Sequence, residues 1–356
     1  MFFQDENYQK WFKVASAAFI AMSFHSQIAI GGKLFSSGNI KEQALCKPSE
    51  GVALDLNELN STSSLYMSLA AARLTHEEDE NEKEDQLLRW GFPTVTHVKE
   101  DFQGHRGYIA ENQEMVLVAI KGSDHLFDWL ANGRFLQSKF DDLAGIEKAR
   151  VHSGVAGEFR RLYSAVKVAL EQKEIGFKPV LITGHSLGGA LATILTYRLY
   201  LDGYNIAALN VFGQPKFAND VFANQLERVI GKFTTHVISS ADVVASLPPG
   251  KSNARQFASV LSDNVLLKTA FTLKVRMMGY DKHVGTQMTI DEKKFERAVM
   301  EKDISNVERE NDFWSTMKGQ LSGAEGIGGV FKELQKVSTE SHPPRFYLCK
   351  LAKLLD

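Results

Sequence analysis

The sequence has few cysteines and no cluster of metal-binding side chains. Its two cysteines, Cys46 and Cys349, lie near opposite ends of the chain. They could pair with each other, but nothing in their spacing indicates a disulfide framework or a metal site. No group of His and Cys has the spacing of a zinc site, so we expect neither a metal nor another cofactor.

The chain also lacks a strong excess of charge of either sign. Its 41 Lys and Arg against 43 Asp and Glu give a formal net charge of -2 at pH 7, which gives no indication of a nucleic-acid partner. Hydrophobic residues make up 44% of the sequence, enough for a sizeable core and too many for a disordered chain. A length of 356 residues suits one large α/β domain or two ordinary ones.

An apolar run near the N-terminus, Val14–Phe24, is too short to cross a bilayer. Lys10 and Lys13 precede it, as in an export signal, but Asp5 and Glu6 balance their charge and no clean A-x-A cleavage site follows. A packed helix, an export signal and a membrane-surface anchor all stay open for this run. A cytoplasmic location is favoured over export, which would require the run to be a signal.

Strand patterns alternate with helical ones through the middle of the chain. We predict strands at residues 115–120, 179–183, 206–212 and 233–239, and a helix at residues 155–169. Such alternation indicates a mostly parallel sheet covered by helices on both faces. We expect an N-terminal extension over residues 1–60 and one α/β domain over residues 61–356, with a helical insertion at about 250–340.

The most informative motif is the turn between a buried strand and a helix, Gly184-His185-Ser186-Leu187-Gly188-Gly189. In this context G-x-S-x-G predicts a nucleophile elbow, in which Ser186 sits strained and exposed. Gly184 and Gly188 are required because a Cβ at either position would clash with the neighbouring strand or helix. The N–H of Leu187, at the start of the new helix, points to where an oxyanion would form.

A serine nucleophile needs a base and an orienting carboxylate, and on this type of sheet they follow in the order Ser, Asp or Glu, His. Asp242 lies just beyond the last predicted strand, where such a sheet presents site residues. A helix cap or turn is the alternative for this aspartate. Two histidines follow it, His283 and His342, and spacing alone does not choose between them.

A second oxyanion donor is expected in the loop after an early strand. Ser123 follows Gly122 at the end of the strand predicted at 115–120, and can offer both its N–H and its hydroxyl. A simple turn is the alternative.

These motifs, taken in order, resemble the class 3 lipase family of fungal triacylglycerol lipases and their plant phospholipase-like relatives. The resemblance covers about residues 64–350. The segments that carry it are Leu87–Phe92, Ala119–Ser123, Asp128–Leu130, Val151–Gly154, the elbow, Asn210–Pro215, Asp242 with Leu247–Pro249, Tyr280–Gly285 and His342–Tyr347.

The resemblance implies an α/β-hydrolase fold and a Ser186-Asp242-His342 triad, with Ser123 and Leu187 as oxyanion donors. It favours His342 as the base, with His283 as the alternative, because the histidine of an H-V-G motif is usually structural in this family. The chain departs from the family pattern in lacking the proline that often follows Asp242 directly and in having Pro343-Pro344 after His342.

The expected function is hydrolysis of carboxylic esters of lipids, of the triacylglycerol lipase or phospholipase type, through an acyl-enzyme. The expected partner is a lipid or ester substrate at a membrane or lipid–water interface, and the oligomeric state stays open. Two alternatives remain: an inactive lipase-like binding or scaffold protein, and an α/β-hydrolase acting on non-lipid esters or thioesters. Residues 125–132 and 260–278 are two candidates for a lid over the site, and the alternative for both is packing on the core.

Overall fold

The computed structural model describes residues 46, 52–100, 104–122, 136–173, 175–280, 282–290, 300–302, 306–321, 323–324 and 326–355. In this part of the chain, the main sheet has eight strands in the order β1-β2-β3-β6-β7-β8-β9-β10. The strands are β1 (Thr94–Glu100), β2 (Gly104–Glu111), β3 (Val116–Ile120), β6 (Val180–His185), β7 (Ile206–Phe212), β8 (Thr234–Ser239), β9 (Thr286–Ile290) and β10 (Met300–Lys302). The run from β3 to β9 is parallel, and β1, β2 and β10 complete the edges in antiparallel pairing.

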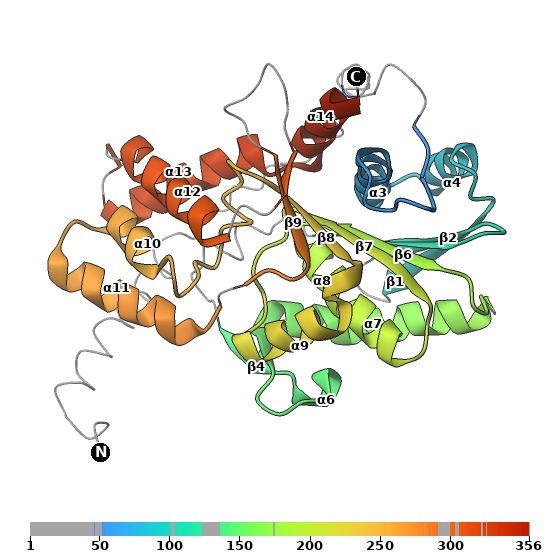
Figure 1. Ribbon diagram of the computed structural model, residues 1–356, viewed down its shortest axis with the longest axis horizontal. Helices are drawn as coiled ribbons and strands as arrows, with labels where there is room; N and C mark the ends of the chain where they lie inside the picture. Colours follow the sequence, from blue (N-terminus) through green and yellow to red (C-terminus); the bar gives the residue numbers. More distant parts are fainter. Residues whose placement is uncertain are drawn as a thin grey trace.

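Helices cover both faces of the sheet (Figure 1). One face packs against α7 (Ser153–Gln172), α8 (Leu187–Leu201) and α9 (Asp220–Ile230), and the other against α3 (Thr62–Leu74), α4 (Glu80–Arg89) and α14 (Pro344–Leu355). A small two-stranded sheet, β4 (Gln137–Lys139) with β5 (Arg150–His152), lies beside α6 (Asp141–Ala144), and a 3-10 turn η1 (Gly231–Phe233) follows α9. This mostly parallel, doubly covered sheet is the α/β-hydrolase fold, so the predicted fold class is confirmed.

The pattern of apolar residues explains why the central elements form. Every residue of β3 and of β6 is buried, as expected for parallel strands covered on both faces. The helix α8 is apolar around nearly its whole circumference and buries almost all of its residues, because it lies between the sheet and the helices α7 and α9. The strands predicted from the sequence at 115–120, 179–183, 206–212 and 233–239 correspond to β3, β6, β7 and β8 within two residues at each end.

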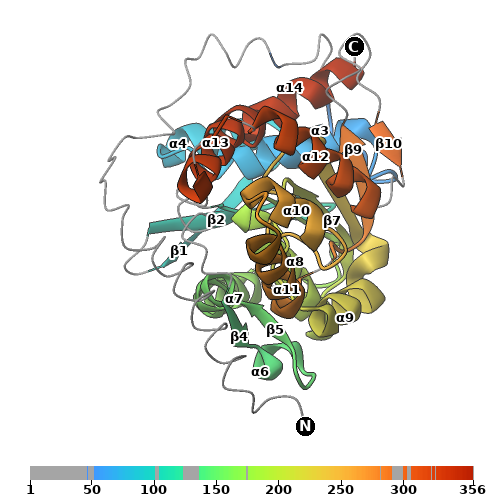
Figure 2. The same cartoon turned by 90° about the vertical axis from the view of Figure 1, so that its left-hand side faces the viewer.

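The stretch expected to form a helical insertion is partly sheet. It contains α10 (Ala254–Leu261), α11 (Val265–Met278), α12 (Asn306–Gln320) and α13 (Gly326–Ser341), but β9 also lies within it and pairs with β8. Figure 2 shows these four helices together on one side of the molecule. A buried ion pair between Lys216 and Glu310, 2.6 Å from Nζ to Oε1, fixes α12 to the loop after β7.

A disulfide between Cys46 and Cys349 joins the segment before α3 to α14. The predicted extension over residues 1–60 lies mostly outside the described residues, but Leu54 and Leu59 pack against the core under α3. The run Val14–Phe24 is also outside them. Across the described ranges, no helix combines the length and apolarity needed to span a bilayer.

Candidate active site

Ser186 lies at the sharp turn between β6 and α8. Its backbone has φ 61° and ψ -129°, a left-handed conformation that a residue with a Cβ rarely adopts. The turn is held because the N–H of Ser186 donates to the carbonyl of Phe212, on the neighbouring strand β7, over 2.9 Å. The side chain is 3% exposed, so the expected strain is present but the serine is buried.

Glycines allow the three segments around this turn to approach closely. A Cβ on Gly184 would press on the backbone of Gly188, and one on Gly188 would press on the carbonyl oxygen of Ile120. This confirms the predicted reason for both glycines. A Cβ on Gly122 would lie 2.8 Å from the carbonyl oxygen of His185, so the end of β3 also packs directly on the turn.

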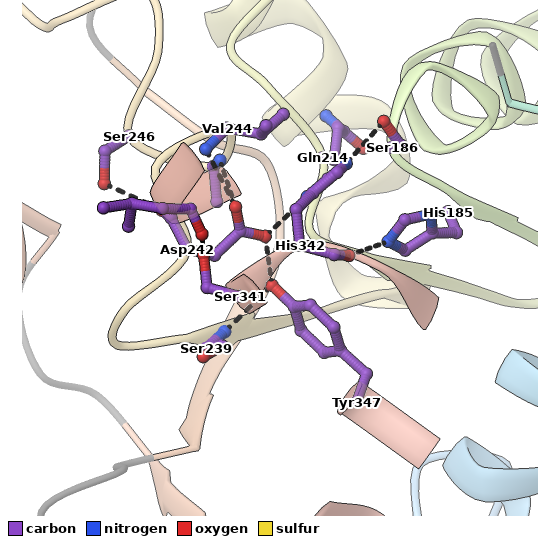
Figure 3. A network of polar contacts seen from close by, with 12 residues as sticks. His185, Ser186, Gln214, Ser239, Asp242, Val244, Ser246, Ser341, His342 and Tyr347 are labelled. Atoms are coloured by element: carbon purple, nitrogen blue, oxygen red, sulfur yellow. Dashed lines mark hydrogen bonds and ion pairs between the residues drawn. The ribbon is translucent and has the colours of Figure 1, made fainter. Parts of the chain in front are cut away.

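His342 joins Ser186 to Asp242 by two hydrogen bonds (Figure 3). Its Nδ1 lies 2.8 Å from Oδ2 of Asp242, and its Nε2 lies 2.7 Å from Oγ of Ser186. The carboxylate can only accept, so Nδ1 carries the proton and Nε2 is left to accept from the serine hydroxyl. His342 occupies the short connection between α13 and α14, and Asp242 follows β8, so segments far apart in sequence meet here.

Asp242 is fully buried, and several donors satisfy its carboxylate. Oδ1 accepts from the N–H of Val244 over 2.8 Å, and Oδ2 accepts from the hydroxyl of Tyr347 over 2.5 Å. The Tyr347 oxygen in turn accepts from the N–H of Ser239 over 3.0 Å. Burial and the neighbouring Asp242 carboxylate raise the pKa of Tyr347 well above its usual value, so it stays a donor. The two sides of this carboxylate are therefore fixed before a substrate arrives.

A glycine gives the three side chains room to meet. Gly213 has φ +55°, and a Cβ there would lie 2.8 Å from Oδ2 of Asp242, 3.0 Å from the Tyr347 hydroxyl and 3.2 Å from Cε1 of His342. Any side chain at this position would displace the network.

His283 lies in a different environment from His342. Its Nε2–H donates to the carbonyl of Ala245 over 2.9 Å, and its ring packs edge-on against His236 at 4.5 Å between centroids. Burial, with His236 as the next cause, holds the pKa of His283 well below its usual value. The described contacts of His283 are thus with His236 on β8 and with Ala245 in the loop after β8. None of them is with Ser186.

Only one of the two oxyanion candidates, Leu187, lies among the described residues. Leu187 is the first residue of α8, directly after Ser186, as the sequence predicts. Ser123 and the lid candidate at residues 125–132 lie outside the described residues. The other lid candidate, 260–278, forms the end of α10 and all of α11. Phe271 and Val275 pack on the core, whereas Val265 and Leu266 are 73% and 68% exposed.

Sequence reasoning did not assign Tyr347, His185 or Gly213 a role around Asp242 and His342. The only signal for Tyr347 and Gly213 was that both lie in segments that resemble the lipase family. Among the described residues, no group of three His, Cys, Asp or Glu side chains is arranged to hold a metal ion.

Comparison with known proteins gives the same family as the motifs. Residues 117–252 match the family model described as lipase (class 3). The secreted mono- and diacylglycerol lipase 1 of Fusarium solani is 32% identical over 151 residues, 41% of this chain and 44% of the relative. A lipase of Rhizomucor miehei is 27% identical over 145 residues, 39% of each chain. The chain thus matches less than half the length of these curated relatives.

Among solved structures, the native Rhizomucor miehei lipase propeptide complex has a TM-score of 0.48 and 17% identity, covering 70% of this chain and 73% of that one. The family match extends from β3 through the elbow and β7 to the loop that contains Asp242. This match and these relatives show that the part of the chain from β3 to the loop containing Asp242 is similar to the class 3 lipase family.

Proposed function

We propose that this protein hydrolyses carboxylic esters of lipids with Ser186 as nucleophile, His342 as general base and Asp242 as the orienting carboxylate. The observation that carries the proposal is the chain of two hydrogen bonds from Asp242 through His342 to a serine held at a left-handed turn. A serine hydroxyl becomes an effective nucleophile when an adjacent base is oriented by a third group.

The reaction follows from this arrangement. Oγ of Ser186 attacks the acyl carbon while its proton passes to Nε2 of His342, and the hydrogen bond from Nδ1 to Asp242 stabilises the resulting imidazolium. The N–H groups of Leu187 and Ser123 donate hydrogen bonds to the oxyanion that forms on the acyl group. His342 then protonates the leaving alcohol. A water molecule, deprotonated by the same histidine, then attacks the acyl carbon. The bond from this carbon to Oγ of Ser186 breaks, His342 returns the proton to Oγ, and the acid is released.

The substrate class rests on the relatives. The Fusarium solani relative is a mono- and diacylglycerol lipase, and the Rhizomucor miehei relative is a lipase. We infer that this protein acts on acyl esters of glycerol, with triacylglycerol and phospholipid as the two substrates to compare. Such substrates are presented at a lipid–water interface.

The first experiment uses a fluorophosphonate probe, which reacts with an activated serine, followed by peptide mass spectrometry. We expect labelling of Ser186 in the full chain and none in Ser186→Ala, with Ser259→Ala on α10 as the matched control. Absence of labelling in the folded full chain would favour an inactive lipase-like binding protein and contradict the proposal.

The second experiment compares substrates. Triacylglycerol, diacylglycerol and phospholipid are assayed side by side with short-chain and thioester controls. Turnover of the lipid esters that disappears in Ser186→Ala supports the proposal. Labelling of Ser186 with turnover of only the non-lipid controls would keep the nucleophile and overturn the lipid substrate.

A further inference from the structure

The helix α11 is apolar on its outer face as well as on its inner one. Phe271 and Val275 pack inward on the core. Leu266, Leu273 and Met277 are 68%, 46% and 59% exposed, and their spacing places them on one stripe of the helix. Exposed apolar residues that form a contiguous stripe on a protein surface often mark a binding site.

The charged residues of α11 and of the groove beside it are all basic. The helix contains Lys and Arg but no Asp or Glu. A groove of about 770 Å³ separates it from α10. The residues that line the groove are Arg255, Gln256, Ser259, Val265, Lys268, Thr269, Thr272, Leu273 and Arg276. Three of them are cations and none is an acid. The nearby Asp263 pairs with Lys318 of α12 over 3.1 Å.

The helix α11 lies at the edge of the molecule (Figure 1). In Figure 2, α11 and α10 lie on the side of the molecule that also carries α12 and α13. The helix α10 contacts α11, α12 and α13, and α13 ends directly before His342. The C-terminal end of α11 is held because Nε2 of Gln137 donates to the carbonyl of Met278 over 2.7 Å. The helix is thus fixed to the body of the protein at both its inner face and its end.

We propose that the outer face of α11, with the groove beside α10, docks on the surface of an anionic phospholipid bilayer. Leu266, Leu273 and Met277 enter the boundary between headgroups and acyl chains, and the cations of the groove contact lipid phosphates. A basic helix with an exposed apolar stripe binds such a surface by combining buried apolar area with attraction to anionic lipid.

Charge distinguishes this partner from two others. In a symmetric contact between two copies of the chain, the same patch meets itself, so Arg255, Lys268 and Arg276 would face like charges. A neutral apolar partner would leave these cations without a counter-charge. An anionic surface satisfies both features of the patch. The inference concerns binding and stands independently of the proposed ester hydrolysis.

The test measures binding of the full chain to vesicles of ether-linked lipids, which contain no ester to cleave. Vesicles of dialkyl phosphatidylcholine are compared with vesicles that also contain dialkyl phosphatidylglycerol. We expect sedimentation with the anionic vesicles only, and loss of binding as salt rises, because salt screens exposed charges.

Two sets of substitutions separate the contribution of the basic residues to binding from that of the apolar residues. The triple variant Arg255→Gln, Lys268→Gln, Arg276→Gln is expected to weaken binding at least about tenfold, because each basic residue near an anionic surface contributes to attraction. Substituting Leu266, Leu273 and Met277 by Ser is expected to weaken binding by a similar factor while leaving the fold intact, since all three are exposed.

Matched controls lie on α4, on the opposite side of Figure 1. Leu88 is 58% exposed and Arg89 is adjacent to it. Leu88→Ser therefore removes an exposed apolar side chain, and Arg89→Gln removes a positive charge, both away from α11. Both controls should bind like the wild type. Equal binding to neutral and anionic vesicles, or unchanged binding by both sets of α11 variants, would overturn the proposal. So would a change in oligomeric state in these variants with vesicle binding retained, because it would assign the face to a second copy.

Discussion

The ring of His185 holds the main chain of His342. Its Nε2–H donates to the carbonyl oxygen of His342 over 2.8 Å, and the two ring centroids lie 4.6 Å apart. Burial holds the pKa of His185 well below its usual value, and the neighbouring His342 adds to this effect, so His185 stays neutral. His185 directly precedes Ser186 in the chain. The strand that positions Ser186 therefore also positions His342, whose ring contacts the serine.

We therefore expect His185→Phe to reduce turnover without preventing substrate binding. Phenylalanine keeps the ring packing but removes the donor, and a small displacement of a reacting group costs about 10- to 100-fold in rate. Ester hydrolysis at equal folded concentration should show a lower kcat with little change in KM. His185→Gln, whose amide can donate to the same carbonyl, should recover part of the activity. Wild-type turnover by His185→Phe would show that this hydrogen bond does not position His342.

The two candidate bases should respond differently to truncation. His342→Ala removes the only described side chain that bridges Ser186 and Asp242, and loss of one member of such a set costs several orders of magnitude in rate. His283→Ala removes a buried ring and its hydrogen bond to Ala245, which should cost about 2–4 kcal/mol of stability. The measurements are turnover and chemical unfolding on the same preparations. A stable, inactive His283→Ala beside an active His342→Ala would reverse the assignment.

Tyr347 should act through Asp242. Tyr347→Phe removes the hydroxyl that donates to the Asp242 carboxylate and accepts from the N–H of Ser239, at a cost of about 1–3 kcal/mol. A carboxylate with fewer donors attracts the His342 imidazolium more strongly, so the acidic limb of the kcat/KM profile should move to higher pH. A loss of stability with an unchanged pH profile would mean that Tyr347 is only structural.

The parts of the fold that depend on local pattern could be predicted from the sequence. The strands β3, β6, β7 and β8 are continuous apolar runs, and the glycines of the elbow follow from steric exclusion. The hairpin of β1 and β2 and the strand β9 were not predicted, because the polar residues among them hide the strand pattern. Their pairing with neighbouring strands decides their conformation.

The shell around the candidate site depends on contacts between distant segments. Tyr347 reaches Asp242 across 105 positions, and His185 reaches His342 across 157. No local spacing encodes such pairs, and His185 in the sequence indicates only a side chain directed into the scaffold. In the sequence, Gly213 likewise has the pattern of an ordinary turn glycine. Only the structure shows that Asp242, Tyr347 and His342 surround it.

A pair of buried histidines should make stability depend on pH. Nε2 of His236 accepts from the N–H of Gln214 over 3.1 Å, and its ring packs on His283. Burial, followed by the charges of Arg309 and Lys216, lowers the pKa of His236 to about 3. In the unfolded chain a histidine takes up its proton near pH 6.5. Between these values the unfolded state binds more protons than the folded one, so stability is present above about pH 6.5 and is lost as the pH falls.

We expect the free energy of unfolding to fall by about 1.4 kcal/mol per pH unit for each such histidine as the pH drops from 6 to 4. The measurement is equilibrium denaturation at a series of pH values. His236→Gln should flatten this slope by about that amount, because glutamine keeps an acceptor for Gln214 and takes up no proton. His97→Gln, on strand β1 away from this pair, serves as the control for losing any one histidine. A slope in His236→Gln equal to that of the wild type would mean that His236 does not stay neutral in the folded protein over this range.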